Sequence, residues 1–329
     1  MKLGRILRVL ISLIILVIVI ANVGAERLFD ALRSISLGWF AIAMVFHLLG
    51  LIVRTYRWSI LIKALGTPVS FGRLLYLYLA GTFFNQFLPT GIGGDVVKII
   101  ELATDHGGAQ AFSSVFADRL IGILGSSLIA LVVAILDPAD VPAVVVTTVI
   151  LISGAILIAS LLMTQRRWFD WIITRLKFWP KIPGSRKIQK VAEALTSYSI
   201  GAIARATLVS LPFTLTLIAT QYALALGLGV AAPIRYFALF VPMVALVQLL
   251  PISFNGLGVR EGTYQVLFGT VGIEGSQAVA MSLMYYIVRV VAGLFGGLIY
   301  LIGNLRVKSA ARHTVQNAED RPDSAPTDH

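Results

Sequence analysis

Long apolar stretches alternate with short polar segments along most of this chain. Apolar runs of about 18 or more residues are typical of helices that cross a lipid bilayer. The pattern predicts about six full spans, over residues 9–23, 37–53, 120–136, 141–164, 206–230 and 275–305. Small residues end the first run, as at a signal-peptide cleavage site, but the many later spans favour a retained anchor.

Two further apolar segments, residues 74–101 and 236–273, are interrupted by proline and glycine. The first contains F-F-N-Q-F-L-P-T-G-I-G-G-D-V-V-K at 83–98, and the second contains L-L-P-I-S-F-N-G-L-G-V-R-E-G at 249–262. Irregular backbone at membrane depth is tolerated only where protein covers it or where it lines a wet cavity. The breaks therefore predict two broken-helix hairpins beside a cavity; the alternative is two plain hairpins with tight turns.

The basic residues indicate how the chain is oriented. Lysine and arginine crowd residues 54–73 and 165–200, whereas the turn at 137–140 carries two aspartates. Cytoplasmic loops carry the excess of basic residues, so both basic segments are expected inside and the acidic turn outside. The chain between the basic segments must then cross an even number of times, so 74–101 enters and returns on the cytoplasmic side.

The same count makes 236–273 enter and leave from the outside. One break from each face is the pattern of an inverted repeat with a binding site where the broken helices meet. We expect an all-α polytopic membrane protein with about six full spans plus two re-entrant broken-helix hairpins in an inverted repeat. One transmembrane domain would cover 1–305, with halves at 1–164 and 201–305 around the basic loop 165–200, and 306–329 would form a disordered cytoplasmic tail.

Composition excludes several function classes. With 57% hydrophobic and only 13% charged residues, the chain does not resemble a soluble domain. The net charge of +11 resides between apolar spans rather than on a soluble face, so nucleic acid is not an expected partner. Cysteine is absent and the four histidines show no ligand spacing; His47 is interpreted as a packed core residue. No metal and no cofactor are expected.

Charged residues within apolar runs are candidates for function. Each would cost at least about 2.5 kcal/mol if unpaired and facing lipid, so they must pair or line a polar cavity. Adjacent residues on a helix point apart, so the neighbours Asp118 and Arg119, and Arg260 and Glu261, are expected to pair with other segments. Structural ion pairing is the alternative to function.

The glycines of the two breaks are expected to leave amides exposed at the start of each returning helix, where anions bind. We therefore predict a substrate-binding site, without catalytic residues, made of the break residues and the buried charges. Its members are Asn85, Pro89, Thr90, Gly91, Gly93, Gly94, Asp95, Lys98, Asp118, Arg119, Ser253, Asn255, Gly256, Gly258, Arg260, Glu261 and Arg289.

Four stretches carry a resemblance to a known family: R-T-Y-R-W at 54–58, F-F-N-Q-F-L-P-T-G-I-G-G-D at 83–95, V-F-A-D-R-L-I-G at 115–122 and P-I-S-F-N-G-L-G-V-R-E-G at 251–262. They resemble the flippase-like transmembrane part of lysylphosphatidylglycerol synthase, over about residues 5–305. The resemblance implies movement of a lipid between leaflets: aminoacylated phosphatidylglycerol, or a lipid related to polyprenyl-linked sugars or hopanoids. Full synthases add a soluble aminoacyl-tRNA-dependent transferase domain, which we do not expect here.

The expected function is a lipid translocase in the cytoplasmic membrane rather than an enzyme. It would move an anionic or aminoacylated phospholipid, or a polyprenyl- or hopanoid-type lipid, between the leaflets. Its partners would be membrane lipids and, as a further candidate, a lipid-modifying enzyme; an oligomer stays open. The alternative is a polytopic transferase that uses Asp95, Asp118 or Glu261 as general base on a lipid phosphate. A Walker-type phosphate-binding motif is absent from the sequence, so we expect gradient-driven or equilibrative transport.

Overall fold

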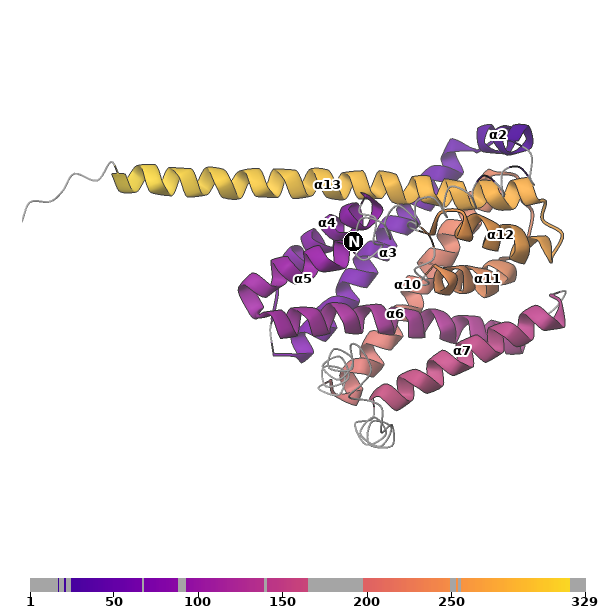
Figure 1. Cartoon of the computed structure of the whole chain (residues 1–329), viewed down its shortest axis with the longest axis horizontal. Coiled ribbons are helices and arrows are strands. Elements are labelled where there is room, and N and C mark those ends of the chain that lie inside the picture. Colours follow the sequence, from indigo (N-terminus) through magenta and orange to yellow (C-terminus); the bar gives the residue numbers. More distant parts are fainter. Residues whose placement is uncertain are drawn as a thin grey trace, which may run out of the picture.

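A computed structural model describes residues 25–66, 68–87, 93–138, 141–164, 198–248 and 256–319, together with Val17, Ala21 and Ser253. Helices make up the regular structure of these residues, and no strand occurs among them, which confirms the all-α fold (Figure 1). The helices are α2 (Ala25–Arg33), α3 (Leu37–Ala64), α4 (Phe71–Phe87), α5 (Gly93–His106), α6 (Gly108–Leu136), α7 (Ala143–Thr164), α10 (Ile200–Gly227), α11 (Ile234–Val247), α12 (Val259–Gly269) and α13 (Gly275–Glu319).

Four of these helices are long and apolar enough to cross a membrane by length and composition. They are Leu37–Ala64, Gly108–Leu136, Ile200–Gly227 and the Gly275–Gly303 part of α13. The chain is thus a polytopic membrane protein, as predicted. Helices α3 and α6 extend beyond their expected spans and contain Arg54, Arg57, Asp118 and Arg119.

Three predicted segments lie wholly or largely outside the described residues: the first span at 9–23, the basic loop at 165–200 and the end of the tail at 320–329. Helix α13 continues beyond residue 305, where we expected disorder, as far as Glu319. Alanine, lysine, arginine, glutamine and glutamate are frequent after residue 305, and these residues favour a helix.

Side-chain contacts identify the two ends of the helix bundle. At one end, Glu101 of α5 accepts from Arg73 of α4 at 3.2 Å and from the Tyr300 hydroxyl of α13 at 3.2 Å. At the other end, Asp137 after α6 lies 3.7 Å from Arg235 of α11. The pair α4–α5 therefore begins and ends beside Tyr300, and α11 begins at the opposite end.

The two broken helix pairs approach the middle of the bundle from opposite ends (Figure 1). Helix α3 precedes α4–α5 and α6 follows; helix α10 precedes α11–α12 and α13 follows. The first helices of these two series pack on each other in opposite directions, since the backbone at Ser36, before α3, donates to Gly227 at the end of α10 at 2.9 Å. The same order of helices thus occurs twice with inverted direction.

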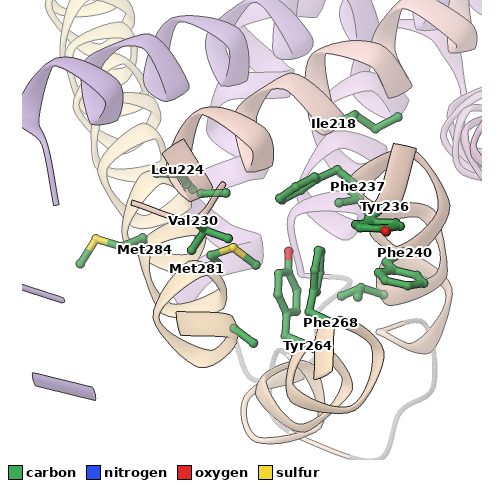
Figure 2. Packing of buried hydrophobic residues seen from close by; sticks show 14 of the residues in the cluster. Ile218, Leu224, Val230, Tyr236, Phe237, Phe240, Tyr264, Phe268, Met281 and Met284 are labelled. Atoms are coloured by element: carbon green, nitrogen blue, oxygen red, sulfur yellow. The ribbon is translucent and has the colours of Figure 1, made fainter. Parts of the chain in front are cut away.

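A hydrophobic core holds the second broken pair in place. Figure 2 shows Tyr264 and Phe268 of α12 side by side, close to Phe237 and Phe240 of α11. The Phe268 ring lies 5.1 Å from Phe237 and 5.2 Å from Phe240, centroid to centroid. Aromatic pairs at such separations add stability beyond their buried area. Methionines of α13 such as Met281 close the other side of this core (Figure 2).

Candidate functional site

The first break is closed by a tight contact between α4 and α5. The Gly94 amide donates to the Asn85 side-chain oxygen at 2.8 Å. A Cβ at position 94 would overlap the carbonyl of Gly81, so only glycine allows the two helices to approach this closely. Gly93 begins α5 and is buried, whereas the predicted site residues Pro89, Thr90 and Gly91 lie outside the described residues.

The second break contains two glycines in the left-handed region. Gly256 has φ of 78° and Gly258 has φ of 81°, a conformation that favours glycine. The Gly258 amide donates to a carboxylate oxygen of Glu261 at 2.6 Å. Ser253 is half-buried in a bend, and Asn255 lies outside the described residues.

These contacts correct one expectation about the helix starts. We predicted that the break glycines leave their amides exposed to an anion, and for Gly94 and Gly258 this is wrong. Each amide already has a side-chain oxygen of the protein as its acceptor. The reason is that an amide left without a partner inside the protein is costly, and Asn85 and Glu261 lie close enough to satisfy it.

A buried ion pair joins α3 to α6. The Arg57 Nε atom lies 2.7 Å from Asp118, and the side chains are 1% and 3% exposed. The Tyr78 hydroxyl of α4 donates to the second oxygen of Asp118 at 2.9 Å. Arg57 also donates to Ser210 of α10 at 3.1 Å, so one network connects four helices.

A second charged group lies on α5 and α6. Asp95 is 2.7 Å from the Lys98 ammonium and 3.5 Å from the Arg119 guanidinium. The Lys98 ammonium also lies over the Tyr78 ring, 4.3 Å from its centroid. Asp118 and Arg119 therefore pair with other helices, Asp118 with α3 and Arg119 with α5, as predicted.

The expectation for Arg260 and Glu261 is wrong, because these neighbours pair with each other. Their closest atoms are 2.5 Å apart and both side chains are fully buried. Ser282 of α13 accepts from Arg260 at 2.8 Å and donates to Glu261 at 3.0 Å. In the first turn of α12, Glu261 folds back to cap Gly258, and this brings its carboxylate within reach of the residue before it.

A cavity of about 250 Å³ lies where the two halves of the chain meet. Side chains of α3, α6, α10, α11, α12 and α13 line it. Four arginines contribute to the lining, namely Arg54, Arg57, Arg119 and Arg289, together with His47. No aspartate or glutamate is among the described residues that line the cavity. The remaining wall is largely apolar and comes mainly from α10 and α11.

Arg54 is the cavity arginine with the fewest polar contacts in the described part of the chain. Its Nε atom has no hydrogen-bond partner there. The guanidinium instead lies between two rings, 5.1 Å from the centroid of Tyr78 and 5.0 Å from that of Phe213. Stacking on aromatic rings fixes the position of a guanidinium without neutralising its charge.

The cavity contains only part of the predicted site. Arg119 and Arg289 line it, whereas Asp95, Lys98, Asp118, Arg260 and Glu261 do not. Arg289 of α13 donates to the Gln248 amide oxygen at 3.4 Å. Arg54 and Arg57 were not among the predicted site residues, because in the sequence their position also fits anchoring at the membrane boundary. His47, which we interpreted as a packed core residue, lines the cavity and packs edge-on against Tyr285, with the ring centroids 6.0 Å apart.

The spacing of the missed arginines is a signal that could have revealed them. Arg54 and Arg57 are three residues apart and so lie on one face of a helix.

Within the described ranges, no group of three or more histidine, aspartate or glutamate side chains is placed to hold a metal ion. The chemistry of the cavity is therefore that of fixed guanidinium groups beside an apolar wall.

Fold and cavity together define a polytopic membrane protein with two broken helix pairs and an arginine-lined cavity between its two halves. The chain belongs to the family described as the lysylphosphatidylglycerol synthase TM region, which matches residues 5–297. The family assignment by resemblance is thereby confirmed.

Archaeal membrane proteins of the UPF0104 group are similar over most of their length. One from Pyrococcus horikoshii is 22% identical over 324 residues, covering 90% of this chain and 96% of the relative. Another, from Methanothermobacter thermautotrophicus, is 25% identical over 307 residues, covering 85% of this chain and 87% of the relative.

Proposed function

We propose that this protein is a lipid translocase of the flippase type, which moves a phosphate-bearing lipid between the leaflets of the cytoplasmic membrane. The observation that carries the proposal is the cavity, where four arginines lie beside an apolar wall and the described lining residues include no aspartate or glutamate. A lipid headgroup with a phosphate and the upper part of its acyl chains has the same two-sided character. Guanidinium groups bind phosphate oxygens with two parallel hydrogen bonds.

The order of the helices supports alternating access to this cavity. In transporters built from inverted repeats, interrupted helices meet at the membrane midplane and the substrate binds between the halves. Here the cavity is lined from both halves, and the two broken pairs come from opposite ends of the bundle. In the proposed topology, α4–α5 is re-entrant from the cytoplasm, α11–α12 is re-entrant from outside, and the basic loop 165–200 is cytoplasmic.

A charged contact couples the first broken pair to the cavity. Asp95 at the start of α5 lies 3.5 Å from Arg119, which lines the cavity. A phosphate that binds Arg119 competes with Asp95 for the same guanidinium. We propose that this competition links headgroup binding to movement of α4–α5.

The contacts of the acidic side chains weigh against the alternative, a transferase. A general base must lie within hydrogen-bond reach of the proton that it removes. Asp118 is engaged by Arg57, Asp95 by Lys98 and Glu261 by Arg260. None of the three carboxylates is among the lining residues.

Reconstitution into liposomes tests the proposal. Purified protein is incorporated into vesicles with a fluorescent phospholipid, and transfer to the outer leaflet is followed by chemical quenching. Arg119→Gln and Arg289→Gln should each slow the transfer at least about ten-fold, the effect of losing about one charge-assisted hydrogen bond. Arg205→Gln is the matched control, because Arg205 is exposed on α10 and, within the described part of the chain, its side chain bonds only the carbonyl of Gly201. Equal rates in all variants and in protein-free vesicles would refute the translocase.

A further inference from the structure

We infer that the headgroup received by this cavity carries more than one negative charge, as a phosphomonoester or a diphosphate does, and that cationic aminoacylated headgroups are rejected. The inference rests on the proposed function, because it names the substrate class of the same cavity. It departs from the aminoacylated lipid that the family resemblance implies. Three properties of the described residues support it.

The first property is the sign of the charge on the side chains that line the cavity. Arginines reach the cavity from α3, α6 and α13, so positive charge surrounds it on several sides. The carboxylates that contact these arginines do not line the cavity and already have partners: Asp118 binds Arg57, and Asp95 is shared by two cations. A lysyl headgroup would place its ammonium groups against guanidinium groups in a low-dielectric site, where like charges repel strongly.

The second property is that arginines of the protein already lie over aromatic rings of the cavity. A cationic headgroup could be held by rings instead of carboxylates, as in aromatic cages. In this cavity, however, cations of the protein already occupy two of the aromatic rings, Phe213 and Tyr285. Phe213 lies beneath Arg54 and Arg57, at 5.0 and 5.6 Å, and Tyr285 has Arg289 at 6.0 Å.

The third property is the arrangement of Arg54. Its Nε atom points to no acceptor in the described part of the chain, although the residue is half-buried. A buried donor without a partner is costly unless a ligand supplies the acceptor. A phosphomonoester offers three non-bridging oxygens and up to two negative charges to Arg54 and the other arginines, whereas a phosphodiester offers two such oxygens and one charge.

The size and shape of the cavity are consistent with a headgroup alone. Its volume of about 250 Å³ lies below the roughly 300 to 1,000 Å³ of pockets that enclose a whole small ligand. Leu217 of α10 and Val241 and Val244 of α11 form part of the apolar wall. The acyl chains therefore lie along α10 and α11 while the phosphate faces α3, α6 and α13.

Binding to the full chain in detergent tests the inference. The probes are phosphatidic acid, phosphatidylglycerol and lysylphosphatidylglycerol with the same acyl chains, each titrated against the purified protein while thermal unfolding is followed. We expect phosphatidic acid to bind at least about ten-fold more tightly than phosphatidylglycerol, and lysylphosphatidylglycerol more weakly than either. Arg54→Gln should reduce the affinity for phosphatidic acid about ten-fold, and Arg54→Lys, which keeps the charge, should reduce it less. The exposed control Arg205→Gln should leave it unchanged.

Other outcomes would refute the charge selection, the lipid nature of the ligand or the proposed translocase function. Lysylphosphatidylglycerol binding as tightly as phosphatidic acid would refute the charge selection. Inorganic pyrophosphate stabilising the protein as strongly as phosphatidic acid, with the same loss in Arg54→Gln, would identify a free anion as ligand and refute the lipid. If Arg54→Gln does not fold, the preference among the three lipids in the unmodified protein still decides. If the protein shows the expected preference among the three lipids but moves no lipid in vesicles, the translocase function is refuted and the headgroup assignment remains.

Discussion

Arg57 on α3 and Asp118 on α6 form an ion pair of 2.7 Å in which both side chains are almost completely buried. The two residues lie 61 positions apart in the sequence, and Tyr78 and Ser210 complete their hydrogen bonds from α4 and α10. The pair therefore holds together four helices, three of which, α3, α6 and α10, line the cavity.

Asp118→Asn should destabilise the protein strongly. The substitution leaves the Arg57 charge buried without its counterion, and breaking a buried pair in this way costs about 3 to 5 kcal/mol. The free energy of unfolding in mixed micelles measures the effect. Asp137→Asn is the control, because Asp137 is exposed, Arg235 is only half-buried and the two lie 3.7 Å apart; pairs this open to solvent contribute about 1 kcal/mol or less. Equal effects of the two substitutions would contradict the structural role of the buried pair.

Glu261→Gln should lower the stability without abolishing lipid binding. It removes the charge that balances buried Arg260 and weakens the cap on the Gly258 amide. Arg260→Met should be destabilising as well, and the double variant less so than the sum of the two, because each single variant strands one charge. Melting temperatures of the two single variants and the double variant measure this coupling. Additive losses, or a loss of turnover with full stability in Glu261→Gln, would instead favour the transferase.

Gly94→Ala should disturb the contact between α4 and α5. The new methyl group would overlap the Gly81 carbonyl, and forcing an extra carbon into a packed site costs about 1 to 3 kcal/mol. Both thermal stability and lipid transfer in vesicles should fall. Gly154→Ala on α7 is the matched control, since nothing lies within 4 Å of its added Cβ. An unchanged transfer rate in Gly94→Ala would show that the break is only a turn.

Single cysteines test the proposed topology, because the native chain has no cysteine. Thr104 of α5 and Glu274 before α13 are both exposed, and we propose that they face opposite sides of the membrane. An impermeant maleimide added to intact cells should label Glu274→Cys and should label Thr104→Cys only after permeabilisation. Labelling of both in intact cells would refute the arrangement of the two hairpins.

The sequence by itself determined the class of the protein. Apolar run length, proline and glycine act locally, so the all-α polytopic fold and the positions of the two breaks could be predicted without knowing which helices touch. The helix ends at the breaks are examples: α4 ends at Phe87, α5 begins at Gly93 and α12 begins at Val259, all within the interrupted stretches at 83–98 and 249–262. Charges inside apolar runs also indicated that ion pairs or a polar cavity had to exist.

Only the tertiary structure decided which of those charges meet. Arg54 and Arg57 are equally compatible with a membrane boundary in the sequence, and they line the cavity because α3 continues past them and packs on α6 and α10. The pairing of Arg260 with its own neighbour depends on Glu261 turning back to the Gly258 amide, in the first turn of α12. The energy of an ion pair depends on distance and burial, and for residues on different helices only packing sets these quantities.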